Sequence, residues 1–596
     1  MGTLWPLAFG GLWSLALTLI LRVLPNKISR WAYGILFFLG YAYAVAQTGY
    51  YSIFTEMMWL TDFRYASEGS DYITVIFQFP LLWWISMALL GAAGIWILVR
   101  YPRWQKGITV PCICGAAAVL TLVGAFQLPK LTYLGDSSIK FAGSDYGRSQ
   151  SAQAAYENMF NAHRLYEICG LYQTGVKDIY KNFIYPHTPA HAAAMKKGIA
   201  QIDDYFARRP AHEENEMTGL LRDKNIVLVL MESMDDWLIG PYTPTISRLM
   251  NEGIQFSRFY TPVYGGIRTF NTEFCTNNGM YLSSKGGYAF DYVTNDFQYS
   301  LANTLTRQGY SAKTFHYNDP SFYSRGVFSL AMGYDEYVCY EDYLDMEDKE
   351  DKKRLYDDKL LFDHPAIAEK FFREEGEHTL NFIITRSAHL SYKYNEVLSY
   401  WGLQQYPEFR GLTGSEETDC AYLKARLVDD MFTRLMEELE ARGELEDTVI
   451  IALTDHYTYG YKNLEELYAL SGVDDDLLLE KTPCFIWAKD LKPQVVEKTM
   501  QTADMLPTML NLFGITPEVS YIGRDIFDPA YEGYAMFSDG SWFQGDLAYN
   551  AEEEKLLYLE KPRKADPELL ARITEAAAEF ARINNLILET DYYHSK

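Results

Sequence analysis

The 596-residue sequence contains few cysteines and few basic residues, and it has neither a fixed-period repeat nor a low-complexity tract. Its seven cysteines are scattered and odd in number, which argues against a dense disulfide framework although one bridge is compatible with them. The chain has 53 Lys and Arg against 78 Asp and Glu, a net charge of −25 at pH 7. Because nucleic-acid phosphates would repel such a chain, no nucleic-acid partner is predicted.

This charge is divided unevenly between two parts of the chain. Residues 1–130 contain eight Lys and Arg and four Asp and Glu, so the remaining residues carry a net charge of −29. The first part is apolar and mildly basic, whereas the second is strongly acidic and long enough to bury a large α/β core. The composition therefore predicts two different kinds of domain.

Four apolar runs occupy the first part, and each is close to the roughly twenty residues that cross a hydrocarbon core. They cover residues 4–24, 31–54, 72–99 and 108–127. A cleaved signal peptide is the alternative for the first run, but the three runs that follow argue against it. We therefore expect residues 1–130 to form a transmembrane domain of about four spans in a bacterial cell membrane.

The loops between these runs predict the orientation of the chain. The first and third loops are basic, with Arg22, Lys27 and Arg30 in or beside the first and Arg100, Arg103 and Lys106 in the third. The positive-inside rule places these loops in the cytoplasm, so all residues after 127 are expected outside the cell. The N-terminus would then also lie outside, which requires either a further span before residue 1 or insertion of the first two helices as a hairpin.

Two further regions follow. Residues 131–220 are predicted to be a helical juxtamembrane linker, with helices over residues 149–171 and 189–208. Their aromatic side chains suit either the lipid headgroup layer or packing against the next domain. Residues 221–596 are predicted to form an extracellular catalytic domain.

From residue 224 onward, short β-branched and apolar runs alternate with amphipathic segments. The strand-like runs cover residues 226–231, 312–316, 380–385, 448–454 and 483–488, and the helix-like segments cover 243–252, 298–308, 419–443, 463–471 and 501–514. This alternation is typical of a mostly parallel sheet covered by helices on both faces. The predicted fold is therefore an N-terminal α-helical transmembrane bundle followed by an α/β domain.

Candidate metal ligands follow two of these strand-like runs. Glu232 comes directly after the first run, and Asp455 and His456 come directly after the fourth. His316 and His389 also lie at or just beyond strand ends. Ligands gather at the carboxyl ends of strands in open α/β sheets, so we expect these side chains to converge. The mixed oxygen and nitrogen donors suit Mn²⁺ or Zn²⁺, whereas Mg²⁺ prefers oxygen alone.

Residues 265–274 suggest a hydroxyl nucleophile, because they place Thr269 beside Arg268 in a short turn entered by glycines. A bound cation lowers the pKa of a coordinated hydroxyl, so Thr269 would complete the metal shell and attack as its alkoxide. An isolated threonine is far more often a turn or cap residue. The hypothesis therefore depends on the ligands around it.

The remaining candidates suit phosphate chemistry. Arg268 and Arg325 would neutralise phosphate oxygens. His389 would protonate a departing alkoxide and later deprotonate an acceptor. The alternative for His316 and Arg325 is a hydrogen-bonded loop pair without a catalytic role.

These residues belong to a series of short motifs at residues 225–233, 268–274, 315–316, 322–325, 387–389, 454–457, 504–508 and 523–525. Together with the multi-span N-terminal part, their order and spacing resemble the lipoteichoic acid synthase group of the sulfatase/alkaline-phosphatase superfamily. The resemblance implies a catalytic domain of that fold that binds one Mn²⁺, with Mg²⁺ or Zn²⁺ as alternatives. It also implies transfer of glycerol phosphate from phosphatidylglycerol to a glycolipid or growing polyglycerolphosphate acceptor through a covalent threonine intermediate.

The resemblance also implies roles for individual residues. The metal ligands are matched by Glu232, Thr269, Asp455 and His456, Thr269 being also the nucleophile, and the residues around the phosphoglycerol are matched by His316, Tyr323, Arg325 and His389. The chain departs from the family in two respects. Members usually have five spans, and they favour Trp at the position of Tyr323 and Asp at that of Asn318. The second difference affects the expected identity of the lipid headgroup more than the expected type of reaction.

Three other functions are alternatives for a chain with these motifs. A sulfatase is excluded, because no Cys or Ser lies in the C/S-x-P-x-R context that formylglycine formation requires. A phosphoethanolamine transferase, or another phosphodiesterase of the superfamily acting on envelope lipids or glycans, would use the same kind of threonine nucleophile. A membrane-anchored binding or regulatory module is the non-enzymatic alternative, and the complete set of ligand-type residues argues against it.

Overall fold

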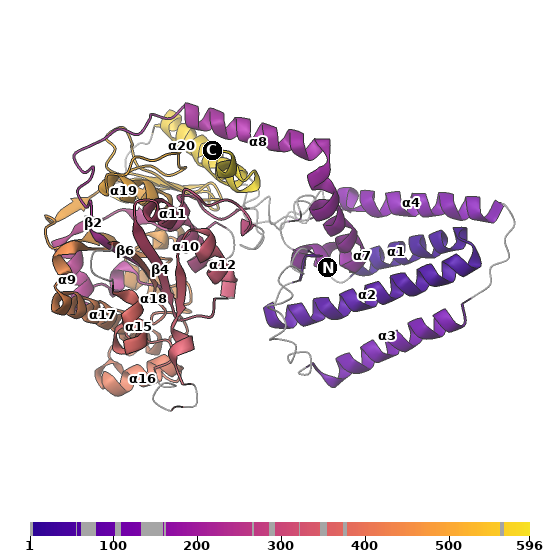
Figure 1. Ribbon diagram of the computed structural model, residues 1–596, viewed down its shortest axis with the longest axis horizontal. Coiled ribbons are helices and arrows are strands. Elements are labelled where there is room, and N and C mark those ends of the chain that lie inside the picture. Colours follow the sequence, from indigo (N-terminus) through magenta and orange to yellow (C-terminus); the bar gives the residue numbers. More distant parts are fainter. Residues whose placement is uncertain are drawn as a thin grey trace. The chain divides into compact units, whose positions relative to one another are not determined.

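The computed structural model describes residues 4–54, 57–60, 79–101, 109–132, 156, 159, 162–264, 268–284, 292–320, 322–345, 348, 354–372, 378–560 and 566–596. The chain forms two compact units, one ending at Lys197 and the other running from Gly198 to Lys596 (Figure 1). The boundary falls inside helix α8 (Pro189–Ala207), which coincides with the second helix predicted in the linker. The stretch predicted as a linker therefore contributes to both units.

The first unit is helical, with α1 (Leu4–Val23), α2 (Asn26–Phe54), α3 (Leu81–Val99), α4 (Thr109–Thr132) and α7 (Ala162–Ile179). Within the described part of the chain, three helical segments are long and apolar enough to cross a membrane: Pro6–Val23, Leu81–Val99 and Val110–Gln127. These apolar helices indicate a membrane protein. Helix α2 covers the second predicted span but is not among the three, so the number of spans stays a prediction.

Helix α1 packs against α4 and α7. Trp13 Nε1–H donates to the side-chain oxygen of Gln173 at 2.7 Å, and both residues are buried. Inside α7, Gly170 has a φ of +69°, and a Cβ there would lie 3.2 Å from the carbonyl oxygen of Pro6. Glycine therefore permits both the kink in α7 and its close approach to α1. Residues 149–155 of the helix predicted over 149–171 lie outside the described residues.

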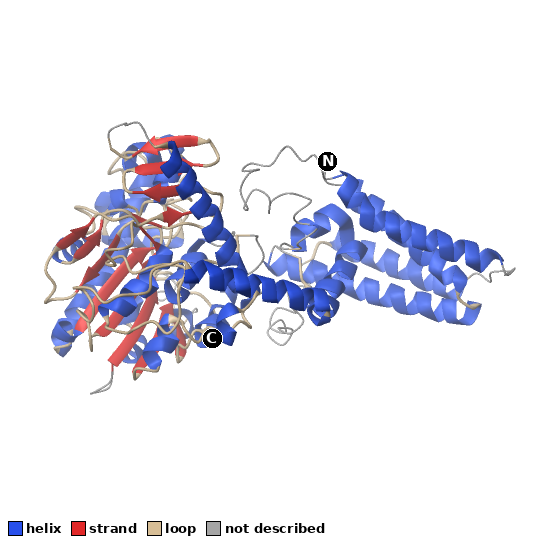
Figure 2. Ribbon diagram, turned by 90° about the horizontal axis from the view of Figure 1, so that it is seen from above, coloured by secondary structure: helices blue, strands red, loops and turns tan. Residues whose placement is uncertain are grey.

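The second unit is built around a sheet with the strand order β5-β4-β6-β1-β7-β8-β2-β9. In that order the strands are Glu336–Cys339, Tyr310–His316, His378–Ile384, Asn225–Met231, Thr448–Thr454, Cys484–Trp487, Ile254–Phe256 and Gln494–Val496. Strand β8 runs antiparallel to both neighbours, whereas the other neighbouring pairs are parallel. The predicted mostly parallel sheet is therefore confirmed, and Figure 2 shows its strands among the covering helices.

Helices surround this sheet and the rest of the second unit. Their bounds are α9 (Pro244–Glu252), α10 (Arg268–Asn278), α11 (Leu301–Thr306), α12 (Arg325–Ala331), α14 (Leu360–Asp363), α15 (Pro365–Phe371), α16 (Val397–Gln405), α17 (Glu416–Arg442), α18 (Leu464–Ser471), α19 (Met505–Leu512) and α20 (Pro567–Glu589). Ser415 caps α17, which ends at Gly443 with a φ of +72°. Its inner face packs Val428 and Met431 into one core with Val229 of β1. Burying each such side chain contributes about 1.5–3 kcal/mol.

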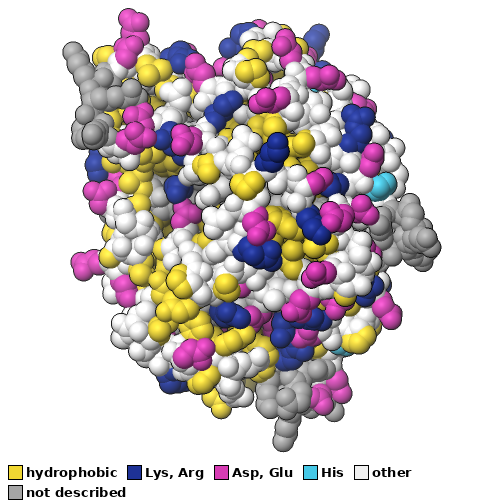
Figure 3. All heavy atoms as spheres, turned by 90° about the vertical axis from the view of Figure 1, so that its left-hand side faces the viewer, with side chains coloured by type: hydrophobic (Ala, Val, Ile, Leu, Met, Phe, Trp, Pro, Cys, Tyr) yellow, Lys and Arg dark blue, Asp and Glu magenta, His cyan; other side chains and the backbone are white. Residues whose placement is uncertain are grey.

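One face of the second unit, on the side where α9 and β2 lie, mixes acidic and basic side chains around scattered hydrophobic ones (Figure 3). Charges of both signs are interspersed on it, although the chain as a whole is strongly acidic. This face therefore does not present a uniform charge that would attract one class of charged partner.

Two smaller sheets complete the second unit. Strand β3 (Phe259–Tyr260) pairs with β10 (Met500–Gln501), and an antiparallel sheet contains β11 (Ala535–Met536), β12 (Trp542–Gln544), β13 (Leu547–Asn550) and β14 (Lys555–Tyr558). Helix α20 carries two buried amides, Asn584 and Asn585. Their side-chain oxygens accept from the backbone N–H groups of Tyr281 and Ser284 at 2.8 and 2.9 Å. Helix α20 therefore fixes the chain that follows α10.

Candidate active site

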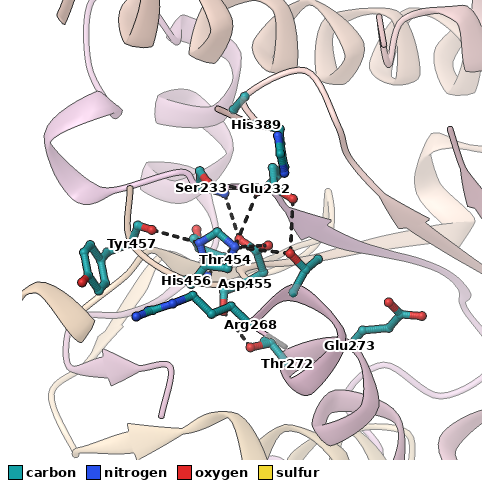
Figure 4. Close-up of polar contacts among 12 residues, drawn as sticks. Glu232, Ser233, Arg268, Thr272, Glu273, His389, Thr454, Asp455, His456 and Tyr457 are labelled. Atoms are coloured by element: carbon teal, nitrogen blue, oxygen red, sulfur yellow. Dashed lines mark hydrogen bonds and ion pairs between the residues drawn. The ribbon is translucent and has the colours of Figure 1, made fainter. Parts of the chain in front are cut away.

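The carboxyl ends of β1 and β7 bring three ionisable side chains together. Met231 and Thr454, the last residues of these strands, are paired in the sheet, so Glu232 and the pair Asp455-His456 emerge side by side. All three side chains are buried, and one potential ligand atom of each lies within 4.8 Å of the others (Figure 4). The predicted convergence at the strand ends is present.

Hydrogen bonds fix the orientation of this group. One carboxylate oxygen of Asp455, Oδ1, accepts from the backbone N–H groups of Ser233 and His456, each at 2.8 Å. The other oxygen, Oδ2, is buried without a hydrogen-bond partner and lies 3.0 Å from His456 Nε2. His456 Nδ1–H donates to the carbonyl of Tyr457 at 2.9 Å, which leaves Nε2 directed at the carboxylates. Orientation of a ligand imidazole by a backbone carbonyl is typical of protein metal sites.

The electrostatics of the group also fit a cation. Burial and the nearby Asp455 raise the pKa of Glu232 to about 7. Burial disfavours the charged form of His456, but the Asp455 carboxylate outweighs it and raises the pKa of His456 to about 9. Two buried carboxylates therefore hold a proton on the imidazole when no metal is bound. A divalent cation would replace that proton and satisfy the unpartnered oxygen of Asp455.

Thr269 lies beside this group at the start of α10. Its Oγ1 is 3.3 Å from His456 Nε2 and 3.5 Å from Glu232 Oε2. The helix is fixed against β7 by Thr272, whose hydroxyl donates to the carbonyl of Asp455 at 2.6 Å. A helix N-terminus stabilises negative charge, which suits a phosphate next to Thr269.

The turn predicted over this stretch is wrong, because Arg268 and Thr269 open a helix. Phe270 and Phe274 are one turn apart and both fully buried, so packing of this apolar face favours the helix. Residues 265–267 of the predicted glycine-entered turn lie outside the described residues.

A pocket of about 230 Å³ opens onto Thr269. It gathers most of the predicted site residues, and its lining consists of Glu232, Arg268, Thr269, His316, Asn318, Phe322, Tyr323, Arg325, Arg386, His389 and Tyr459. Of the predicted residues, Asp455 and His456 are absent from the lining, and they lie behind Glu232 and Thr269.

Arg325 and His316 form one wall through a buried network. Arg325 Nε–H donates to Glu273 Oε2 at 2.8 Å, and its Nη1 donates to His316 Nε2 at 2.9 Å. His316 Nδ1–H donates to the carbonyl of Ile384 at 2.7 Å. Burial and the Arg325 guanidinium hold the pKa of His316 well below its usual range, so this imidazole is neutral. These two residues therefore form a hydrogen-bonded pair that borders the pocket, but the pair joins the end of β4 to the start of α12 and does not lie in a loop.

Tyr323 borders the same wall in a strained conformation. Tyr323 and Ser324 have φ values of +59° and +52°, in the left-handed region that non-glycine residues rarely adopt. The Tyr323 ring centroid lies 5.3 Å from the guanidinium carbon of Arg325. Strain of this kind costs about 1–3 kcal/mol per residue and persists where surrounding structure imposes it.

His389 follows β6 and lies on the Glu232 side of the group (Figure 4). Its Nδ1–H donates to the carbonyl of Leu390 at 2.6 Å, so Nε2 carries the free lone pair. Burial and the nearby Arg386 lower the pKa of His389 to about 4. The resting imidazole is therefore neutral and able to accept a proton.

The chain is similar to several known proteins. Residues 224–515 match the Sulfatase family model. Lipoteichoic acid synthase 2 of Bacillus subtilis is 23% identical over 399 residues, covering 64% of this chain and 59% of that protein. A lipoteichoic acid synthase of Staphylococcus saprophyticus is 24% identical over 404 residues, covering 63% of this chain and 57% of that protein. The crystal structure of a lipoteichoic acid synthase from Listeria monocytogenes superposes with a TM-score of 0.54 and 18% identity, covering 66% of this chain and 98% of that one.

The chain contains a sulfatase-family domain and is lipoteichoic acid synthase-like in sequence and in the fold of that domain. The matches cover less than two thirds of the two curated relatives' own lengths. The solved structure supports the fold of the catalytic unit, and the predicted fold class is confirmed.

Three side chains of this lipoteichoic acid synthase-like site were missed by sequence analysis: Glu273, Arg386 and Tyr459. Glu273 is the buried partner of Arg325. The Tyr459 ring packs against the Arg268 guanidinium, with 4.7 Å between the ring centroid and the guanidinium carbon. Tyr459 and Arg386 flank predicted residues in the sequence, but only the pocket shows that their side chains face Thr269.

The Glu273 pair provides a test of the pocket wall. Replacing Glu273 with Gln is expected to lower the thermal unfolding midpoint clearly, because a buried guanidinium left without its carboxylate costs about 3–5 kcal/mol. Glu446→Gln is the matched control, since Glu446 pairs with Lys489 on the surface and such pairs contribute about 0–1 kcal/mol. Differential scanning calorimetry of the whole protein measures both. Equal midpoints for the two variants would contradict a structural role of Glu273.

Proposed function

We propose that this protein transfers glycerol phosphate from phosphatidylglycerol to a glycolipid or growing polyglycerolphosphate acceptor. The observation that carries the proposal is the position of the Thr269 hydroxyl, 3.3 Å from His456 Nε2 and beside Glu232. A nucleophile at a candidate metal centre, facing a pocket lined by guanidinium and imidazole groups, suits a phosphodiester. The names of the relatives support lipoteichoic acid synthesis as its setting.

Glu232, Asp455 and His456 would hold a divalent cation, with Thr269 as a fourth ligand. We propose Mn²⁺, because two carboxylates and an imidazole suit it better than Mg²⁺. When bound, the cation supplies Lewis-acid chemistry, which lowers the pKa of the threonine hydroxyl and offsets negative charge at the site.

The reaction is proposed to proceed in two halves. In the first, Thr269 Oγ bonds to phosphorus and the bond from phosphorus to the diacylglycerol oxygen breaks. The proton lost by Thr269 is the one that the departing oxygen needs, and His389 Nε2 is its proposed carrier. In the second, the acceptor hydroxyl gives its proton to the same nitrogen and bonds to phosphorus, and Thr269 leaves and recovers a proton. Diacylglycerol thus departs before the acceptor arrives, so the pocket holds one lipid at a time.

The function is tested by incubating the full-length protein in lipid nanodiscs with labelled phosphatidylglycerol and Mn²⁺. Diacylglycerol should appear, and peptide mapping should find a glycerophosphoryl group on Thr269. Phosphatidylethanolamine as the sole lipid donor should release no diacylglycerol. Release from phosphatidylethanolamine alone would instead favour a phosphoethanolamine transferase.

The orientation of the chain is a separate prediction. Under the positive-inside rule, the basic loops that flank the apolar helices predict a second unit outside the cell. Protease added to intact cells should therefore release fragments of residues 198–596, detected with an antibody to that unit. Digestion that occurs only after lysis would reverse the proposed orientation.

A further inference from the structure

Arg386 differs from the other two arginines of the pocket, because no carboxylate neutralises it. Arg268 lies 3.7 Å from Glu480, and Arg325 lies 2.8 Å from Glu273. Among the described residues, no Asp or Glu oxygen lies within 4.0 Å of the Arg386 guanidinium, and its Nε is buried without a hydrogen-bond partner. Burying a guanidinium without a hydrogen-bond or ion-pair partner costs folding free energy. The Arg386 side chain is therefore available to pair with an anion that enters the pocket.

In the part of the chain that the structure describes, neighbouring residues fix the backbone of Arg386 by hydrogen bonds but do not pair with its guanidinium. Arg386 lies two residues beyond β6, and its backbone N–H donates to the Asp358 carboxylate at 2.8 Å. The neighbouring N–H of Ser387 donates to the same carboxylate at 2.7 Å. The guanidinium carbon lies 5.1 Å from the ring centroid of Tyr356, so the side chain is supported on one face. Its remaining donors border the pocket with Thr269.

The net charge of the site indicates that the Arg386 guanidinium balances the charge of a bound anion. The candidate metal ligands and the ion-pair partners of the pocket arginines comprise four carboxylates, Glu232, Asp455, Glu273 and Glu480, against the guanidinium groups of Arg268, Arg325 and Arg386. Asp358 is left out of this count because it accepts from backbone N–H groups and not from a guanidinium. With the carboxylates ionised, a divalent cation bound and Thr269 still protonated, as before its attack, these groups carry a net charge of +1. A phosphodiester carries a single negative charge, which this excess would match. Without Arg386 the count falls to zero.

We propose that Arg386 binds a non-bridging oxygen of the substrate phosphodiester and gives the pocket its preference for a singly charged headgroup. This inference rests on the proposed function for the identity of the diester. A guanidinium donates two parallel N–H groups to phosphate oxygens, and a lysine cannot reproduce that geometry. Arg325 and Arg268 each already have a carboxylate within 4.0 Å, so they add less uncompensated positive charge to the pocket than Arg386 does.

The test is direct binding, which does not depend on turnover. Full-length protein in nanodiscs with Mn²⁺ is titrated by calorimetry with glycerophosphoglycerol, a water-soluble phosphodiester, and with uncharged glycerol. Arg386→Gln is expected to weaken diester binding by roughly 10- to 100-fold, as expected for a lost charged hydrogen bond. Arg386→Lys should recover part of the loss, and glycerol binding should be the same in all variants.

Arg410→Gln is the matched control, because Arg410 also lies against a tyrosine ring, 4.2 Å from the centroid of Tyr394, but is absent from the pocket lining. It should bind the diester as the wild type does. Equal diester affinity in Arg386→Gln and the wild type would overturn the proposal. So would an equal loss for diester and glycerol, or loss of Mn²⁺ binding in both Arg386 variants, since Arg386 would then shape the pocket or the metal site.

The two proposals fail separately. If diester binding requires Arg386 but phosphatidylglycerol releases no diacylglycerol, the proposed function is wrong and the anion-binding role stands. If phosphatidylglycerol is cleaved but Arg386→Gln binds the diester normally, only the role of Arg386 is overturned.

Discussion

Thr269→Ala should abolish diacylglycerol release from phosphatidylglycerol, by at least roughly 10³-fold, as expected when a covalent nucleophile is removed. No glycerophosphoryl adduct should form. The reason is geometric, because Thr269 provides the hydroxyl 3.3 Å from His456 Nε2. Lipid mass analysis and intact-protein mass spectrometry measure the two effects.

Thr276→Ala is the matched control for this prediction. Thr276 is also in α10 and is buried, but its hydroxyl donates to the carbonyl of Thr272 and does not line the pocket. It should leave diacylglycerol release within a few-fold of wild type. His389→Ala should still form some adduct but turn over slowly, because the same nitrogen must activate the acceptor. Substantial release by Thr269→Ala would place the nucleophile elsewhere.

Removal of one metal ligand is expected to have an equally large effect. Asp455→Ala or Glu232→Ala should abolish Mn²⁺ binding, because each deletes one of two carboxylates that face the His456 imidazole. In the wild type, Mn²⁺ at 100 times its dissociation constant should stabilise the fold by about 2.7 kcal/mol. A chelator should reverse this stabilisation, and neither variant should respond to metal.

Asp474→Ala serves as the control, because the Asp474 side chain is exposed and does not belong to the candidate metal group. It should keep wild-type Mn²⁺ affinity in calorimetry and the same metal-dependent rise in unfolding temperature. Unchanged Mn²⁺ affinity in both ligand variants would contradict the assignment of this centre.

The central strands could be predicted because they are buried on both faces. All seven residues of β1 and of β7 are buried, so selection for apolar side chains leaves an uninterrupted run in the sequence. The candidate metal ligands could then be predicted from their position alone, at the ends of those runs. By contrast, β2, β9 and the four-stranded sheet consist of two to four residues each, too short to produce a periodic signal.

The partners of the site residues were less accessible to sequence reasoning. Glu273 pairs with Arg325 across 52 residues of chain, and Glu480 faces Arg268 across a longer interval. No local pattern encodes such contacts, because they depend on how α10 is placed against neighbouring loops. The unpaired state of Arg386 is a property of the whole pocket and emerges only when every neighbour is in place.

The pairing of β1 with β6 and β7 has a consequence for how the protein folds. The amide of Ser233 reaches the carboxylate of Asp455 across 222 residues, so the candidate metal site forms only after most of the second unit has been synthesised. Contacts of such long sequence separation slow folding, and until β7 arrives the apolar β1 has no partner on that side. We therefore expect a nascent chain that stops before β7 to be prone to aggregation and unable to retain metal. Acquisition of the ion would mark the completion of folding.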